Sequence, residues 1–156
     1  MARMNTDGLD DLISEMQRMG EDGGDVARAM VAAAGIEIRD AWKESAERHQ
    51  LIDTGAMIDS IGFPGPVQKI GDAFYQDVFP QGKDRKGTRN AEKAFILNYG
   101  SSRIRPTHWV DEAEAEAEPK VQERLEQIWG EFLETGKVPD IIDPGGMSGG
   151  ITKTTK

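Results

Sequence analysis

The 156-residue chain has no cysteine, only two histidines and no long hydrophobic run. The lack of cysteine excludes disulfides, cysteine-ligated zinc, iron–sulfur clusters and thiol nucleophiles. No stretch approaches the roughly 18 apolar residues that span a bilayer, and the first residues lack the apolar centre of a secretion signal. We therefore expect a protein that has no membrane contact and stays inside the cell, or in a particle assembled there.

The sequence also offers little for catalysis or for holding a cofactor. His49 and His108 are the only histidines, and nothing places either beside a nucleophilic hydroxyl, so we expect both at a helix end or on the surface. The phosphate-binding patterns GxxxxGK[ST] and GxGxxG are missing, and residues 21–25 do not follow the register of a calcium loop. We expect no enzymatic activity, no cofactor and no metal.

Charge is abundant and unevenly distributed. The chain has 19 Lys and Arg against 28 Asp and Glu, a net charge of −9. Residues 83–105 hold seven bases and two acids, a charge of +5, which leaves −14 for the remainder. The average surface repels phosphate, so bulk charge does not favour nucleic-acid binding. Separated charges of opposite sign instead favour docking or self-assembly.

Hydrophobic periodicity predicts helices in the first third of the chain. Apolar residues recur at helical spacing over 9–19, which predicts a short amphipathic helix, and over 25–49, which predicts a helix of about 37 Å. The connector 20–24 is rich in Gly and acidic residues, and Asp25 is the expected N-cap. Trp42 lies on the apolar face of the longer helix and is expected in the core.

Short strands are predicted in the middle of the chain. Residues 51–61 predict a capped turn, one or two helical turns and the start of a strand, and 67–70 and 73–79 predict two strands joined by a Gly-Asp turn. Residues 80–90 have no period and predict a mobile loop. Residues 91–99 are too continuously apolar to decide between helix and strand.

A final helix is predicted from the alternation of Glu and Ala over 111–118, because both residues favour helix over strand. Pro119 is expected either to kink this helix or to begin a second piece. Trp129 and Phe132 restore an apolar face that is expected to pack into the core.

These elements predict an α+β fold, in which N-terminal helices and a C-terminal helix pack on a small antiparallel sheet, with a flexible loop and a C-terminal tail. We expect a single domain over 1–136, of which 1–24 is the N-terminal helix and its connector. Residues 137–156 are rich in Gly, Pro and Thr and predict a tail without a core of its own.

Charged side chains and one tryptophan are the candidates for contacts with a neighbouring copy or partner. They are Lys83, Arg85, Lys86, Arg89, Arg103, Arg105, Trp109, Glu112, Glu114, Glu116 and Glu118. The basic loop at 83–89 has three open interpretations: it keeps the protein soluble, it touches phosphates without reading bases, or it meets the acidic helix of a neighbouring copy. The glutamates favour a solvated helix face over acid–base catalysis. Trp109 is either a core residue or an interface anchor.

Several short motifs occur in a characteristic order. Residues 53–61 read DTGAMIDSI, residues 98–101 read NYGS, and residues 106–110 read PTHWV. Together with the Ala-rich helical segment before them and the helix after them, they resemble the neck proteins of long-tailed bacteriophages, the tail-completion or head–tail joining family. The first motif matches the family pattern D-T-G-x-L-x-x-S-I with Met57 in place of Leu. The later motifs depart from the family's E-F-G-T and P-F-L, and the resemblance covers about residues 20–135.

The resemblance implies a structural protein of the virion neck or tail, assembled in the cytoplasm of a host bacterium. Such proteins form rings, usually of about six copies, between the capsid portal and the tail tube. The implied partners are copies of the chain itself, neighbouring neck, portal-side or tail-tube proteins, and the genomic DNA that passes through the lumen. No membrane is implied.

Within this interpretation, we assign the first motif to the fold of a turn. Asp53 or Thr54 would cap it, Gly55 would occupy a position that a side chain would crowd, and Ser60 would bond to local backbone. A tail-terminator ring subunit is the nearest alternative function. An alternative of another class is a cytosolic nucleic-acid-associated factor that uses the basic loop, and an enzyme is the third.

Overall fold

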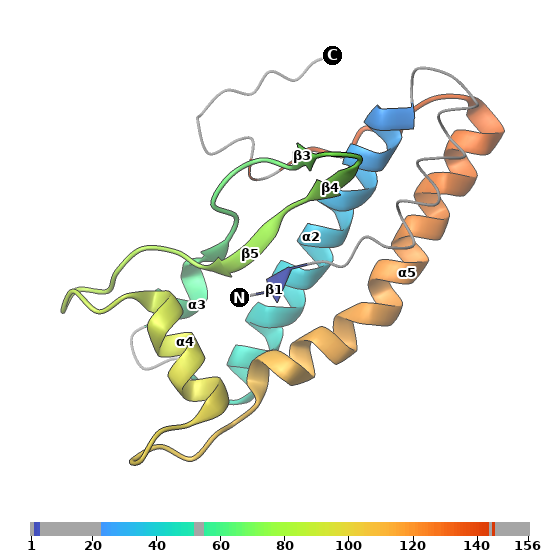
Figure 1. Cartoon of the computed structure of the whole chain (residues 1–156). Helices are drawn as coiled ribbons and strands as arrows, with labels where there is room; N and C mark the ends of the chain where they lie inside the picture. Colours follow the sequence, from blue (N-terminus) through green and yellow to red (C-terminus); the bar gives the residue numbers. More distant parts are fainter. Residues whose placement is uncertain (1, 4–22, 52–54, 144, 146–156) are drawn as a thin grey trace.

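The computed structural model describes residues 2–3, 23–51, 55–143 and 145. Two long helices dominate it, α2 (Gly23–Arg48) and α5 (Trp109–Thr135), and they pack along each other (Figure 1). Two shorter helices, α3 (Ala56–Asp59) and α4 (Asn90–Tyr99), lie near the end of the pair where α2 ends and α5 begins. The predicted α+β class is confirmed, and 91–99 is a helix.

The predicted long helix near the N-terminus is confirmed as α2. Small and apolar residues give it a closely packed face, with the buried side chains Val26, Met30, Ala34 and Trp42 spread along its length. The helix already includes Gly23, so Asp25 lies in its first turn. The prediction that Asp25 is the N-cap is therefore wrong. The helix predicted over 9–19 lies outside the described residues.

Short antiparallel strands cover part of α2. One sheet has β5 (Asp77–Pro80) in its centre, paired with β1 (Ala2–Arg3) and with β2 (Ile61–Gly62). The other is the hairpin of β3 (Gln68–Ile70) and β4 (Ala73–Tyr75), which lies beside the first half of α2 (Figure 1). The sequence predicted one small sheet, and the described residues form two.

The division between the sheets falls at Gln76, inside the strand predicted over 73–79. Its side chain is buried, and its Nε2 donates a hydrogen bond to Asp143 Oδ1 at 2.8 Å. On either side of Gln76 the chain pairs with different strands, so the predicted strand becomes β4, paired with β3, and β5, paired with β1 and β2.

Two hydrophobic clusters fill the space along the helix pair. The first lies under the β3–β4 hairpin and includes Met30, Phe74, Ile128 and Phe132, with the half-buried Trp129 packed against it. The second lies at the end with the short helices and contains Trp42, Met57, Ile61 and Trp109, among others. Burying each large apolar side chain contributes roughly 1.5–3 kcal/mol. The predicted core positions Trp42 and Phe132 are confirmed.

The final helix continues through its proline. Pro119 is exposed and lies inside α5, which runs without a break to Thr135, so the prediction of a second helical piece is wrong. The ribbon of α5 bends in its first half (Figure 1). A bend is expected where proline removes the N–H that would bond to Ala115.

The first part of the predicted tail folds back onto the domain. Gly136, at φ 70°, ends α5, and Val138 and Ile141 then pack against the first cluster. Asp143 Oδ2 accepts a hydrogen bond from the backbone N–H of Val67 at 2.8 Å. Residues up to Asp143 are therefore held against the hairpin.

Candidate interaction surface

The basic loop between β5 and α4 has a defined shape. Asp84 Oδ1 accepts hydrogen bonds from the backbone N–H groups of Lys86 and Thr88, both at 2.9 Å. Asp84 Oδ2 lies 2.8 Å from Lys93 Nζ on α4, and this bond holds the pKa of Asp84 below its usual value. The segment predicted to be a mobile loop is therefore a turn closed by one carboxylate.

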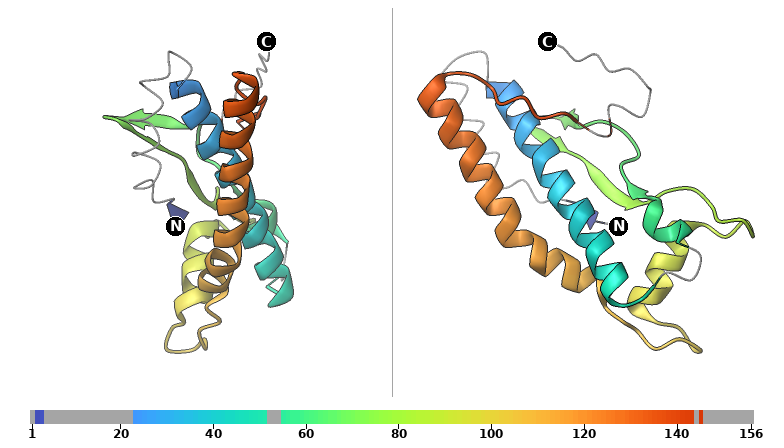
Figure 2. Two further views of the ribbon diagram at one scale, coloured as in Figure 1. Left: turned by 90° about the vertical axis from the view of Figure 1, so that its right-hand side faces the viewer. Right: turned by 180° about the vertical axis from the view of Figure 1, so that it is seen from behind.

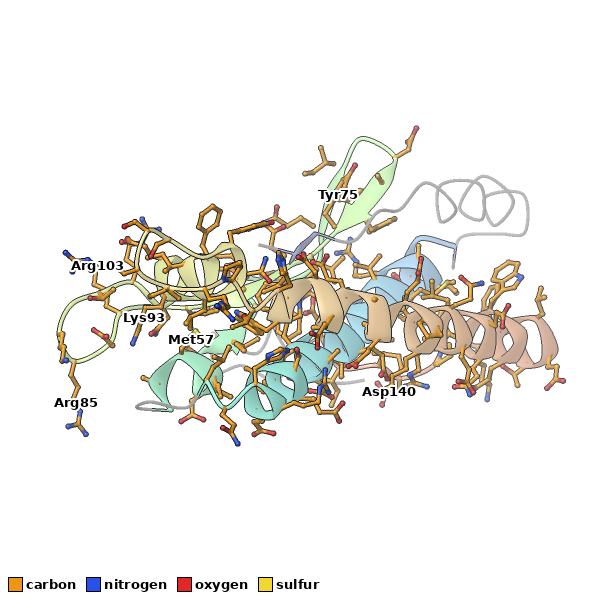
Figure 3. The ribbon with its side chains drawn as sticks, turned by 90° about the horizontal axis from the view of Figure 1, so that it is seen from below. Met57, Tyr75, Arg85, Lys93, Arg103 and Asp140 are labelled. Carbon is orange, nitrogen blue, oxygen red and sulfur yellow. The ribbon has the colours of Figure 1, made fainter. Side chains whose placement is uncertain are left out.

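This closed turn leaves its bases on the outside. Lys83, Arg85, Lys86 and Arg89 are exposed, and none forms an ion pair with another described residue. Arg85 points away from the body of the molecule (Figure 3). The turn therefore presents four unpaired positive charges to a partner or to solvent.

A second basic loop follows α4. Gly100 has φ 81°, and an added Cβ there would lie 2.8 Å from the backbone oxygen of Ile104. The Ser101 hydroxyl accepts hydrogen bonds from the N–H groups of Arg103 and Ile104, both at 3.2 Å. Arg103 and Arg105 are exposed, and Figure 3 places Arg103 at the same end of the molecule as Arg85.

The segments NYGS and PTHWV, which carry part of the resemblance, are joined by hydrogen bonds. Asn98 is buried, and its Oδ1 accepts the N–H of Val110 at 2.9 Å. The Thr107 hydroxyl donates to the carbonyl of Leu97 at 2.7 Å, and the N–H of His108 donates to the carbonyl of Asn98 at 3.1 Å. The end of α4 and the start of α5 therefore form one rigid joint.

Trp109 is a core residue. It is 0% exposed, its Nε1 donates to the carbonyl of Ala94 at 3.3 Å, and its ring meets Trp42 edge-on at 5.5 Å between centroids. The Ser45 hydroxyl of α2 donates to the Trp109 carbonyl at 2.7 Å. Of the two predictions for Trp109, the core position is confirmed and the interface anchor is wrong.

The turn of the first motif packs into the same cluster. Gly55 has φ 75°, and an added Cβ would approach only Asp59 Oδ2, at 3.9 Å, so glycine is favoured by backbone conformation and not by crowding. The Ser60 hydroxyl donates to the Met57 carbonyl at 2.7 Å, which confirms its predicted local bond. Asp53 and Thr54, the other two residues of the predicted turn, lie outside the described residues.

Half of the acidic candidates are engaged within the chain. Glu112 lies 3.0 Å from His49 Nε2 and 3.6 Å from Arg48 Nη2, and the hydrogen bond from His49 is the main cause that lowers the pKa of Glu112. Both Glu116 oxygens accept hydrogen bonds from Arg48 at 3.0 Å. These contacts tie the end of α2 to the first turns of α5.

The other two acidic candidates, Glu114 and Glu118, are exposed on α5. Partial desolvation is the main cause that raises the pKa of Glu114, and the neighbouring Asp111 carboxylate raises it further. Neither forms an ion pair with another residue in the described ranges.

An exposed aromatic pair was missed by the sequence reasoning. Phe95 and Tyr99 of α4 are 61% and 58% exposed, and their ring centroids lie 4.8 Å apart. Ile104, in the second basic loop, is 40% exposed. Phe95 and Tyr99 are four residues apart, a spacing that places two side chains next to each other on a helix. The sequence left 91–99 undecided between helix and strand, so this spacing could not be used to predict the pair.

Each histidine lies beside a carboxylate. His49 follows the last turn of α2 beside Glu112, and the exposed His108 precedes α5 with its Nδ1 3.0 Å from Asp111 Oδ2. The described residues contain no group of three or more potential metal ligands among His, Asp and Glu. Among them, no helix is long and apolar enough to cross a bilayer.

Comparison with known proteins finds no match. The chain matches no protein-family model, no curated protein and no solved structure. The resemblance to phage neck proteins therefore depends on the motifs and their order along the chain alone.

Proposed function

We propose that the chain is a structural subunit of the phage neck, forming a ring that completes the tail or joins it to the capsid portal and lets DNA pass. The observation that supports this most is the convergence of the motifs. Met57 and Ile61 of the first motif and Trp109 of the last share one cluster, and Asn98 of the middle motif bonds to Val110 beside it. Segments that are remote in sequence thus build one end of the molecule. This end, called here the rigid end, comprises α3, α4, the loops on either side of α4 and the start of α5.

The charge distribution supports an assembly role. The rigid end carries six exposed bases that are unpaired within the described residues, while α5 contains nine acids and two bases, a formal charge of −7. Separate surfaces of opposite sign favour head-to-tail contacts between copies, and such contacts close into a ring when the rotation is right. The net charge of −9 disfavours adhesion to DNA that passes through.

The test is to remove the chain from the genome that encodes it. We expect DNA-filled heads and tails of normal length that do not join, and we expect purified chain to restore joining in an extract. Normal infectious particles without the chain would contradict the proposal. Overlong tails would instead identify the tail terminator, the neighbouring ring that stops tube growth.

The six exposed bases also favour a second candidate, a nucleic-acid-associated factor. Filter binding to duplex DNA separates the two functions. Submicromolar affinity with a steep salt dependence would support the nucleic-acid factor, because several phosphates would be neutralised. We expect no binding at moderate salt.

A further inference from the structure

We infer that the end of the molecule around α4 docks onto the second half of α5 in another copy of this chain. The docking surface, called here the α4 surface, consists of the loop 83–89, the loop 100–105, and the exposed Phe95 and Tyr99 of α4, the helix that joins these loops. This inference deepens the proposed function and depends on it, because it names the two surfaces that meet in the ring.

The composition of the α4 surface favours a protein partner. The α4 surface combines exposed aromatic rings with arginines, and both residue types are enriched among those that contribute most to protein interfaces. Duplex DNA would use the bases through its phosphates but offers little to the Phe95–Tyr99 pair or to Ile104. The four loop bases and the two arginines after α4 require that the partner be acidic.

The second half of α5 has the matching chemistry. Glu112 and Glu116 are already bound by Arg48, so the first turns of α5 are partly neutralised. Glu123, Glu126 and Glu134 are exposed and form no ion pair with any described residue. Leu133, which is 51% exposed, adds an apolar side chain close to Glu134. We therefore place the acidic partner surface at 123–134, beyond the predicted 111–118 strip, in which Glu114 and Glu118 are also exposed.

The position of the two surfaces determines the type of contact. In both Figure 1 and Figure 2 the loops around α4 lie at one end of the molecule and the second half of α5 lies at the other. A copy therefore cannot join its own two surfaces, and each copy can bind one neighbour at each end. Contacts of this head-to-tail kind build rings or filaments rather than closed pairs.

Charge reversal on each surface tests the contact. One variant carries Arg85→Glu and Arg89→Glu, and the other carries Glu123→Lys and Glu126→Lys. In each variant alone, like charges face each other, so we expect self-association weaker by at least about tenfold and a mass near 17.2 kDa by light scattering. When the two variants are mixed, opposite charges face each other at every contact, and we expect assemblies of the wild-type size.

Two control variants test whether the loss of assembly is specific to the two surfaces. Lys69→Glu in β3 and Glu47→Lys in α2 reverse exposed charges outside both surfaces, and we expect them to assemble as the wild type does. Circular dichroism checks that every variant is folded.

Three outcomes would overturn the inference: variants that assemble singly as well as the wild type, a mixture that stays monomeric, or a wild-type chain that is monomeric at low salt up to about 1 mM. Loss of binding to a duplex DNA probe by Arg85→Glu/Arg89→Glu, with assembly intact, would assign the α4 surface to DNA instead. The proposed function is judged separately, by the heads and tails that accumulate when the chain is missing.

Discussion

Two buried side-chain hydrogen bonds connect the helices of the rigid end. Ser45 donates to the carbonyl of Trp109, and Asn98 accepts from the N–H of Val110, so α2 and α4 are each attached to the first turn of α5. Both side chains are buried, and water does not compete for these bonds. The position of both basic loops depends on this joint, because α4 lies between them.

Ser45→Ala should loosen the joint without changing the fold. The substitution removes one buried donor, and we expect the free energy of unfolding to fall by about 1 kcal/mol in urea denaturation. Ser102→Ala, at an exposed position in the second loop, is the control and should change it by less than about 0.5 kcal/mol. Equal effects at the two positions would contradict a specific role for the bond to Trp109.

Gly100→Ala should cost more than Gly82→Ala. Both glycines have positive φ, 81° and 69°, so each substitution carries a backbone penalty of at least about 1 kcal/mol, and at Gly100 the ψ of 174° places the backbone in a region that is essentially restricted to glycine. At Gly82 the new Cβ meets open space, whereas at Gly100 it lies within 2.9 Å of Ile104 and Pro106 atoms. We expect Gly100→Ala to lower the free energy of unfolding by at least about 2 kcal/mol, measured by urea denaturation. Similar losses at both positions would show that the second loop relaxes freely.

At the scale of elements, local signals predicted the two long helices, whereas the helix over 91–99 and the contacts between elements were not determined by local signals. The alanine-rich α2 and the Glu–Ala start of α5 follow from periodicity and propensity alone. The hydrogen bond between Gln76 and Asp143 spans 67 positions, and the pairing of Arg48 with Glu116 spans 68 positions. Contacts at such separations leave no local pattern in the sequence, so neither could be predicted.

The candidate site was predicted in part. The exposed bases were identified from charge, but the closed shape of their loop was not, although Asp favours turns because its side chain accepts hydrogen bonds from the backbone ahead of it, as Asp84 does. Trp109 was left open because the sequence does not reveal its contacts with Trp42 and Ala94.

Acid should open the first basic loop. Lys93 lowers the pKa of Asp84 below its usual value of 3.8, so the ionised carboxylate stabilises the folded loop above the unfolded pKa, and this contribution is lost as the pH falls through the folded pKa. We expect Asp84→Asn to lower the thermal unfolding midpoint at neutral pH, with the difference from wild type vanishing below the folded pKa.

The measurement is a series of melting curves across acidic and neutral pH. Asp72→Asn, at an exposed carboxylate in the β3–β4 turn, is the control and should leave the midpoint unchanged. A deficit of Asp84→Asn that persists unchanged into strong acid would contradict the role of the ionised carboxylate.

At the scale of the whole molecule, charge is separated between the two ends. The +5 of residues 83–105 lies around α4, and the −7 of α5 extends away from it. Contacts between these ends depend on charges near the surface, which salt screens over about 10 Å at 0.1 M and about 3 Å at 1 M. The net charge of −9 is therefore best understood as the sum of two opposed surfaces.

Assembly of the wild-type chain should accordingly weaken with salt. We expect the dissociation constant between copies to rise at least about tenfold from 0.1 M to 1 M salt, measured by analytical ultracentrifugation. Assembly that strengthens or stays constant across this range would indicate an interface dominated by apolar contacts and would contradict the charge pairing.

Electron microscopy of the head–tail junction decides whether the chain is a neck subunit. The particles to use are those assembled by the genome that encodes it, and mass spectrometry of the same particles determines whether the chain is present. We predict one ring of about six copies around the DNA channel at the junction, with the α4 surface of each copy against α5 of the next. Absence of the chain from the particles, or its presence only elsewhere in them, would contradict this.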